Sequence, residues 1–333
     1  MGYFEIGPLE ALGVLFISGY FGGRLANRFR FPRVTGYIIA GILLSPSVSG
    51  IIPVGLVREK FHIINDIALA VIAYSVGGSL KFSKLKRLGK SIFVINLSEA
   101  LSAFLVTFLL IGVLSPYVVG PGVGAGSFTA FYLPLALIIA AVSAATAPAA
   151  ILAIVHEYRS KGPLTMTLLG VVALDDAVAV ILFAFAGSIV RTITEASGFS
   201  VYRMIAEPTV IILGSILLGT VVGFLLSGLA TWVRKTKCLL VIVLGVTFLC
   251  YGVAERLQFS PLLANMMVGF LIVNRASQSD RLFEALEEVE EPIFALFFTL
   301  AGAHFDLRVF KLVGSLAFII VGCRFIGKFI GTR

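Results

Sequence analysis

The sequence predicts an all-α protein that crosses a lipid bilayer many times. Hydrophobic residues make up 59% of the 333-residue chain and charged residues only 13%, which is about half of the charged fraction of soluble domains. The apolar residues fall in runs of roughly 17–25, the length of a membrane-spanning helix. Short segments of the first half also recur in the second half, a pattern typical of transporters.

The apolar runs predict eleven membrane spans, separated by loops that hold most of the charged residues. Each run is expected to be a helix, because a helix of about 20 residues crosses the hydrocarbon core. The spans are expected at about 8–26, 35–50, 61–80, 91–115, 130–156, 164–190, 208–233, 238–254, 261–274, 292–305 and 312–331.

The distribution of Lys and Arg over the loops predicts the orientation. With the N-terminus outside, the cytoplasmic loops hold more than twice as many Lys and Arg residues as the outer loops, as the positive-inside rule requires. An odd number of spans then places the C-terminus in the cytoplasm. These basic loops account for the formal net charge of +8, so no nucleic-acid partner is expected.

One connecting segment has a different character. Residues 279–292 read SDRLFEALEEVEEP, in which Phe283, Leu286 and Val289 recur every third residue among five glutamates. The pattern is typical of an amphipathic helix on the cytoplasmic surface. It is either a solvated connector between bundles or an acidic region that attracts cations.

An internal repeat relates the two halves. TGYIIAGILL (35–44) resembles LANMMVGFLI (263–272), and VIAYSVGGSLKFSKLKRLGKS (71–91) resembles ALFFTLAGAHFDLRVFKLVGS (295–315). Each span then corresponds to the one seven positions later, so the two copies cross the membrane in opposite directions. Inverted repeats are a transporter signature, with the substrate site near the midplane.

The repeat predicts one transmembrane domain over 1–333. Its expected parts are a first repeat over 8–190, a linker helix over 208–233 and an incomplete second repeat over 238–333. Span 4 then corresponds to the last span, and two further helices of a thirteen-helix plan have no segment here. Either the chain is a truncated form or its second repeat is incomplete.

Two adjacent carboxylates, Asp175 and Asp176, lie within the apolar run GVVALDDAVAVILF at 170–183. Asp176 follows Pro163, near the start of its span, by 13 residues, or about 20 Å along a helix, close to the middle of a hydrocarbon core about 30 Å thick. An ionised Asp there costs roughly 2.5–3.5 kcal/mol. Such a group is suited to hold a proton or a monovalent cation in turn, and their competition, with alternating access, gives exchange. The alternative is that both carboxylates are held in permanent ion pairs.

The span before the aspartates contains Pro148. Proline lacks the donor that a helix interior needs, and it disfavours a helical conformation at Ala147. Ser143 and Thr146 lie just before it. We therefore expect a broken helix whose carbonyl groups and Thr hydroxyl coordinate a desolvated cation; the alternative is a simple proline kink.

The last span supplies candidate counter-ions. Arg324 and Lys328 are four residues apart in GCRFIGKFIG (322–331), so they share one helix face, and Glu99 is a further acid within an apolar run. Unpaired charges are costly in lipid. The hypothesis is that Asp175 pairs with Lys328 and that Glu99 pairs with Arg324. His156, at the end of the proline-containing span, is either a helix-end histidine or a pH sensor.

These segments resemble the monovalent cation:proton antiporter superfamily, specifically its second family, which includes Kef-type and Nap-type sodium or potassium/proton exchangers. The resemblance runs along essentially the whole chain. It is carried by FPRVTGYIIAGILLSP (31–46), SVGGSLKFSKLKRLGK (75–90), SAATAPAAILAIVHEYRSKGPLT (143–165), GVVALDDAVAVILFAF (170–185), LFFTLAGAHFDL (296–307) and RFIGKFIG (324–331).

The resemblance implies an inverted-repeat sodium/proton antiporter fold with broken helices, and secondary active Na⁺ or K⁺/proton antiport in a prokaryotic plasma membrane. It implies a homodimer with separate core and dimerisation bundles, and no cofactor besides the transported ions. Asp176 is then the shared cation and proton site, and Asp175 with Lys328 the acid–base pair linked to electrogenic exchange. Two departures stand out: Thr146-Ala147-Pro148 replaces the Thr-Asp of many relatives, and the second broken helix, expected as span 12, has no segment here. No GxGxxG motif of a Kef-type nucleotide-binding domain follows either.

Three other functions were considered. The first is a regulatory membrane protein of the same fold that does not transport. An intramembrane aspartyl protease would need its two aspartates on different helices, one of them in a GxGD context, whereas here they are adjacent. A bile-acid-type symporter shares the inverted-repeat plan but has no need of Asp175 beside Asp176.

Overall fold

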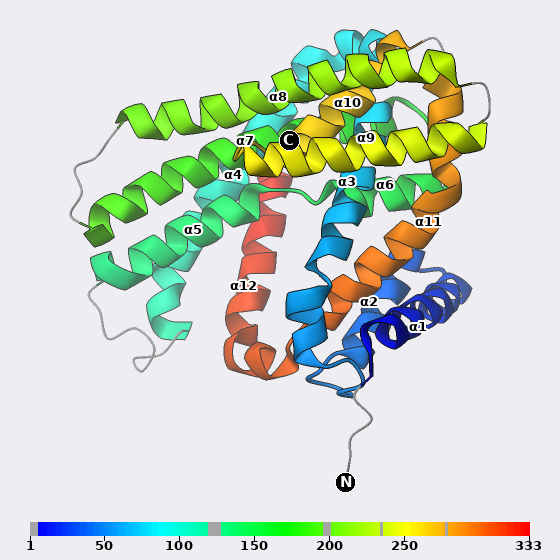
Figure 1. Ribbon diagram of the computed structural model, residues 1–333. Coiled ribbons are helices and arrows are strands. Elements are labelled where there is room, and N and C mark those ends of the chain that lie inside the picture. The colour runs from blue at the N-terminus through cyan, green and yellow to red at the C-terminus, as the bar shows by residue number, and fades with distance from the viewer. Residues whose placement is uncertain (1–5, 119–127, 196–200, 234–235, 277–278) are drawn as a thin grey trace.

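In a computed structural model the chain is almost entirely helical (Figure 1). The structure describes residues 6–118, 128–195, 201–233, 236–276 and 279–333. The α-helices in these ranges are α1 (Pro8–Arg28), α2 (Arg33–Leu44), α3 (His62–Gly78), α4 (Phe82–Val118), α5 (Leu133–Ala144), α6 (Pro148–Glu157), α7 (Pro163–Glu195), α8 (Val201–Trp232), α9 (Thr236–Arg256), α10 (Pro261–Arg275), α11 (Ser279–Ala303) and α12 (Leu307–Gly331). Two short π-helices, η1 (Leu56–Lys60) and η2 (Phe128–Tyr132), precede α3 and α5.

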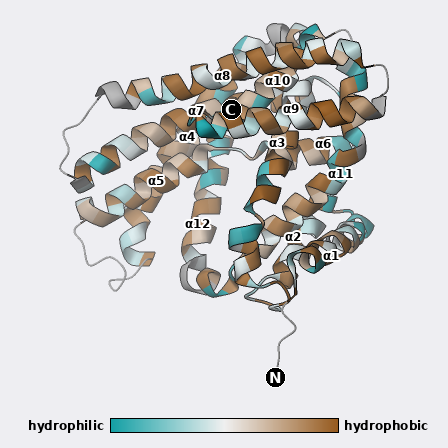
Figure 2. Cartoon of the chain, in the orientation of Figure 1, coloured by the Kyte–Doolittle hydropathy of each residue, from teal (hydrophilic) through white to brown (hydrophobic). Residues whose placement is uncertain are grey.

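The helices correspond one for one to the eleven expected spans when α5 and α6 are taken as the two halves of one span. Six segments of the described chain are long and apolar enough to cross a membrane. Helix α8 runs along the outside of the molecule and consists largely of hydrophobic residues (Figure 2). Leu213 and Leu217 of α8, for example, are 61% and 66% exposed. In an integral membrane protein these side chains face the lipid. Lipid tails are themselves apolar, so this exposure has no hydrophobic cost.

Helix packing divides the described chain into two bundles. The first, the site bundle, consists of α4, α5, α7 and α12, which pack on one another. The second, the scaffold bundle, consists of α1, α2, α3, α8, α9, α10 and α11. Helix α6 lies between them and contacts α2, α3 and α7. The bundles also meet where α7 packs against α8.

Two pairs of scaffold helices cross glycine to glycine. A Cβ atom on Gly41 of α2 would collide with the carbonyl oxygen of Thr299 on α11, and one on Gly302 would collide with that of Ile38 on α2. On α10, a Cβ atom on Gly269 would collide with the backbone of α3 at Gly78. The glycines that make the two halves of the sequence similar therefore allow close backbone contact between α2 and α11 and between α3 and α10.

The acidic segment 279–292 is part of a longer helix. Helix α11 runs without interruption through Pro292, so the expectation of a separate surface helix is wrong. The amphipathic pattern itself is present: Leu282 and Leu286 are buried in the scaffold bundle, while Glu287 is exposed. Glu290 is also buried. The apolar face that the sequence shows thus packs against protein.

Candidate functional site

The broken helix lies next to Pro148. Helix α5 ends at Ala144 and α6 begins at Pro148, and Ala145 and Ala147 between them have extended backbone with ψ angles of 143° and 109°. The cause is local, because proline has no N–H to continue α5 and its fixed φ suits the first position of a new helix. The expectation of a broken helix is confirmed by this fold. The break leaves backbone carbonyl groups and the Thr146 hydroxyl without intrahelical partners.

Asp175 is the more enclosed of the two aspartates. It is 1% exposed, and its Oδ1 accepts a hydrogen bond of 3.3 Å from Nδ2 of Asn96 on α4. The same amide nitrogen donates to the carbonyl oxygen of Val171 at 3.2 Å. Within the described chain, Oδ2 of Asp175 accepts no hydrogen bond. Asp175 therefore faces α4 with one oxygen held and the other available.

Asp176 faces away from Asp175, because adjacent helical residues project about 100° apart. It lines a hollow of about 820 Å³ between α5, α7, α8 and the start of α10, together with Ala145 of the break. We call this the Asp176 hollow. Its wall follows α7 from Asp176 to Thr192. Oδ2 of Asp176 is buried and accepts no hydrogen bond from the described residues, so this oxygen can take a ligand.

Lys328 of α12 joins three elements of the site bundle. Its Nζ donates to Oε1 of Glu99 on α4 at 2.5 Å and to the hydroxyl of Thr146 in the break at 2.6 Å. The same nitrogen lies 4.0 Å from Oδ2 of Asp175. The Lys328 and Glu99 side chains are only 18% and 12% exposed. One ammonium group thus neutralises Glu99 at contact distance and lies at the limit of an ion pair with Asp175.

Arg324 has a different partner from the one expected. Its guanidinium donates to the carbonyl oxygen of Ser143 at 3.0 Å, in the last turn of α5, where unpaired carbonyl groups favour a cation. The hypothesis that Glu99 pairs with Arg324 is therefore wrong in this structure, and Glu99 pairs with Lys328 instead. The buried Ser143 contributes to the site through its backbone carbonyl oxygen, which binds Arg324.

The register between α4 and α12 explains this exchange of partners. The hydroxyl of Ser102 donates to the carbonyl oxygen of Gly327 at 2.7 Å, and that of Ser98 donates to the carbonyl oxygen of Gly331. A Cβ atom at either glycine would collide with the backbone of α4. Small residues four apart on both helices thus fix their contact, and this contact brings Lys328 level with Glu99.

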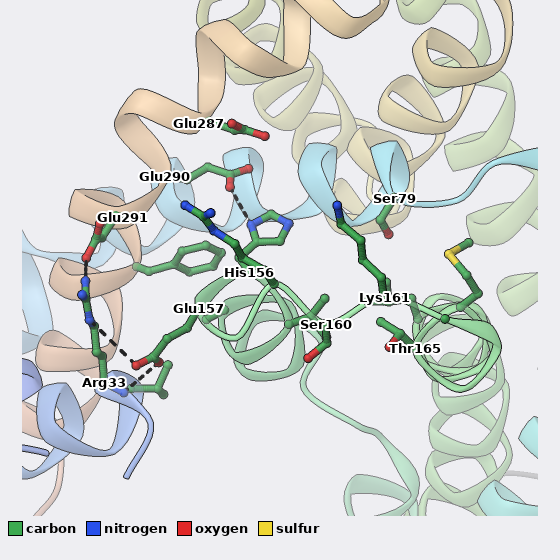
Figure 3. Close-up of a pocket in the computed structure, with 18 of the residues that line it drawn as sticks. Arg33, Ser79, His156, Glu157, Ser160, Lys161, Thr165, Glu287, Glu290 and Glu291 are labelled. Carbon is green, nitrogen blue, oxygen red and sulfur yellow. Dashed lines mark hydrogen bonds and ion pairs between the residues drawn. The ribbon is translucent and has the colours of Figure 1, made fainter. Parts of the chain in front are cut away.

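A second cluster of charges lies at the other end of the broken helix (Figure 3). Nδ1 of His156 on α6 is 3.0 Å from Oε2 of Glu290 on α11, and the hydroxyl of Ser75 on α3 donates to the other oxygen of Glu290. The backbone N–H of Arg33, at the start of α2, donates to Oε2 of Glu157 at 2.9 Å. The Arg33 guanidinium also pairs with Glu291. These contacts tie the end of α6 to two scaffold helices, α2 and α11.

This cluster could not be predicted from the sequence. His156 and the acidic run at 284–291 are each visible in the sequence, but nothing local indicates that they meet across helices far apart along the chain. The cluster lines a hollow of about 1420 Å³, which we call the His156 hollow. Along α7 this hollow extends from Pro163 only as far as Leu169.

A packed cluster of apolar side chains separates the two hollows. Leu169 and Ala173 of α7 pack there with Leu152 of α6, Met266 of α10 and Phe298 of α11. Along α7, the packed section lies between the His156 hollow and Asp176. Asp176 is therefore reached from the Asp176 hollow and closed off from the His156 hollow.

A family model described as "Sodium/hydrogen exchanger, transmembrane" matches residues 12–333. The chain belongs to this family. Members of a sodium/hydrogen exchanger family are transporters rather than enzymes, so the aspartyl protease alternative is excluded. The resemblance to cation:proton antiporters is confirmed, and the protein is an integral membrane protein.

Two curated relatives and one solved structure agree with this assignment. The chain is 22% identical to the high-affinity Na⁺/H⁺ antiporter NhaS3 of Synechocystis sp., over 92% of this chain and 71% of that protein. It is 23% identical to the probable Na⁺/H⁺ antiporter GerT of Bacillus cereus, over 99% of this chain and 82% of that protein. The structure of the sodium proton antiporter MjNhaP1 from Methanocaldococcus jannaschii at pH 8 superimposes with a TM-score of 0.75, at 18% identity, over 97% of this chain and 77% of that one. The antiporter fold is thus confirmed.

Proposed function

We propose that this exchanger carries a monovalent cation, Na⁺ or K⁺, against protons by letting the two compete for Asp176. One observation carries the proposal: a buried carboxylate oxygen of Asp176 accepts no hydrogen bond from the described residues and borders a hollow beside a helix break. No Lys or Arg of the described chain lies within ion-pair distance of Asp176, whereas Lys328 approaches Asp175. A carboxylate in low dielectric without a fixed counter-ion favours a proton or a mobile cation.

Alternating access is supported by the asymmetry around Asp176. The Asp176 hollow reaches the carboxyl group, while the packed cluster and the His156–Glu290 and Arg33–Glu157 contacts close the opposite side. A movement of the site bundle against the scaffold bundle would exchange these roles. By the predicted orientation, the open side is the outer one. The exchange as proposed needs no cofactor.

The inverted repeat supports the same mechanism. The repeat relates α2 to α10 (spans 2 and 9) and α3 to α11 (spans 3 and 10). The α2–α11 crossing is therefore the counterpart of the α3–α10 crossing. The α4–α12 pair is its own counterpart, because the repeat relates these two helices to each other. A fold built from two opposed copies has two related conformations, one open to each side. We propose that the first repeat ends with α7 and that α8 is the linker helix.

Several features implied by the resemblance also remain proposals. We propose a homodimer in a prokaryotic plasma membrane, with the N-terminus outside. Light scattering of the purified protein would test the dimer. Labelling of single cysteines placed in the loops, in whole cells and in everted vesicles, would test the orientation.

The decisive experiment uses proteoliposomes with a trapped pH dye, to which Na⁺, K⁺, Li⁺ and NH₄⁺ are added in turn. Ammonium is included because the chain is 20% identical to the ammonium/H⁺ antiporter subunit AmhT of Alkalihalophilus pseudofirmus, over 86% of this chain and 67% of that protein. Wild-type protein should give cation-dependent dequenching, and Asp176→Asn should give none. The matched control, Asp280→Asn, changes an exposed aspartate at the start of α11.

Each outcome has a consequence. Dequenching that survives in Asp176→Asn would show that another group carries the ion. No dequenching by the wild type with any of the four cations would instead favour a regulatory protein that does not transport.

A further inference from the structure

Lys328 lies between two carboxylates, and its ammonium nitrogen is much closer to one of them than to the other. Its ammonium nitrogen is 2.5 Å from Oε1 of Glu99 but 4.0 Å from Oδ2 of Asp175. Asp175 is 1% exposed, and this oxygen accepts no hydrogen bond from the described residues. A buried carboxylate oxygen without a donor is costly. The arrangement therefore leaves Asp175 under-compensated because Glu99 holds the shared cation.

We propose that Glu99 is a positioning residue, which competes with Asp175 for Lys328 and so sets the pH at which protons displace the transported cation. The proposal rests on the proposed antiport, and it goes beyond it by assigning a role to an acid that does not line the Asp176 hollow. Lys328 carries its ammonium on a flexible four-carbon stem. A displacement of about 1–2 Å, well within such a side chain's freedom, exchanges one partner for the other.

The charged groups of the cluster come from three helices of the described chain. They are Glu99 on α4, Arg324 and Lys328 on α12, and Asp175 and Asp176 on α7. The break adds neutral acceptors, the Thr146 hydroxyl for Lys328 and the Ser143 carbonyl oxygen for Arg324. Two cations thus face three acids, and Arg324 is directed to the end of α5. The distribution of Lys328 between Glu99 and Asp175 then decides how strongly the α7 acids attract a proton.

The sign of the effect follows from this charge balance. Glu99→Gln removes one negative charge and frees Lys328 to pair with Asp175, and both changes stabilise the ionised carboxylates of α7. Protons then compete less well with the cation, so transport persists to lower pH. Lys328→Gln removes the shared positive charge, which favours protonation of the same acids and moves the profile to higher pH. Opposite shifts from the two partners of one ion pair are a result that a merely structural role would not produce.

The test measures the apparent KM for the transported cation as a function of pH in proteoliposomes. Glu99→Gln should move the profile by roughly one pH unit toward acid, the scale on which a charge within about 4–6 Å acts on a carboxyl group. Lys328→Gln should move it by a similar amount toward alkali. Glu99→Asp, which keeps the charge, should lie closer to wild type. Asp176→Asn is measured in parallel and tests the proposed function by itself.

The proposal is overturned if Glu99→Gln keeps the wild-type pH profile, or if both substitutions move it in the same direction. If Glu99→Gln does not fold, as judged by size-exclusion chromatography, Lys328→Gln still decides: no shift, or an acid shift, contradicts the proposal. Transport that stays active in Asp176→Asn would contradict the proposed function, whatever the Glu99 variants do.

Discussion

The two hollows at opposite ends of α7 differ in both lining and depth. The larger, the His156 hollow, is lined by charged side chains that bind one another, and it ends at Leu169. The smaller, the Asp176 hollow, has a mostly apolar wall that includes Ala179 and Ala184, is also lined by Arg191 and Glu207, and reaches the carboxyl group of Asp176. Size does not decide access here. The ion-paired side chains lie at the closed end, in the His156 hollow, and the mostly apolar wall lies at the open end, in the Asp176 hollow.

This difference indicates how the closed end opens. The ion pair and hydrogen bond between α6 and the scaffold bundle are directional contacts, whereas small apolar residues can slide past one another. The His156–Glu290 pair is ionic only when His156 carries a proton, so this contact is stronger at acid pH. The comparison therefore predicts separate consequences for changes at the two ends.

The largest effect is expected from filling the Asp176 hollow. Ala179→Trp places an indole against the path to Asp176 and should lower cation-dependent dequenching by about a hundredfold, the scale on which small misplacements in a site lower rates. Ala179→Val should have an intermediate effect. Val241→Trp is the matched control, because Val241 of α9 is 70% exposed on the outer, apolar surface. An active Ala179→Trp protein would show that ions reach Asp176 by another route.

An intermediate effect is expected from weakening the closed end. Glu290→Gln removes a buried charge whose hydrogen bonds contribute about 1.5–3 kcal/mol, so the population open toward the His156 hollow should rise by roughly ten- to a hundredfold. The measurement is the rate at which a water-soluble thiol reagent labels Ala173→Cys from that side, in a background in which Cys238, Cys250 and Cys323 are replaced by alanine.

Two comparisons sharpen the Glu290 experiment. Glu287→Gln changes an exposed acid of the same hollow and should leave the labelling rate almost unchanged. The thiolate is the form that reacts, so each rate is divided by that of an exposed cysteine, Val241→Cys, at the same pH. In otherwise wild-type protein this ratio should rise with pH as His156 loses its proton, and Glu290→Gln should flatten this dependence. Equal labelling rates in all variants would mean that the pair does not hold α6 against the scaffold bundle.

The smallest effect is expected at Arg33. Its side chain is 42% exposed, and its Nε lies 3.8 Å from Oε1 of Glu157, so solvent screens the pair. Exposed ion pairs contribute only about 0.2–1 kcal/mol. Arg33→Ala should therefore raise the Ala173→Cys labelling rate by about fivefold at most, and by less at high salt. A change as large as that of Glu290→Gln would reverse the ranking of the two contacts.

The fold could be predicted largely from the sequence because its determinants are local. Apolar runs of membrane-spanning length give the helices, Pro148 gives the break, and the four glycines of the repeat give the crossings. The adjacent aspartates in an apolar run likewise indicated a site on α7. Each of these signals depends on a residue and its near neighbours.

The ion pairs could not be predicted because they depend on register between distant helices. Arg324 and Lys328 are one turn apart, about 6 Å along α12, so a one-turn slide against α4 exchanges their partners. The register is set by contacts of Ser98 and Ser102 with the α12 backbone, which the sequence does not reveal. The role of Glu290 is hidden in the sequence for a related reason: it is one of several similar acids, and only the packing of α11 shows that it is buried.

The glycine crossings of α2 with α11 and of α3 with α10 are expected to make the scaffold bundle the rigid part of the transporter, which stays still while the site bundle moves. Helices whose backbones touch have no layer of side chains between them that could deform, so they resist shear as a unit. If Asp176 binds the ion as proposed, we expect the accompanying movement at the softer contacts beside α7, which include Ala179 and Ala184. An exchanger of this construction is expected to move one rigid bundle against the other. Its most rigid contacts are the glycine crossings of the scaffold bundle, away from Asp176.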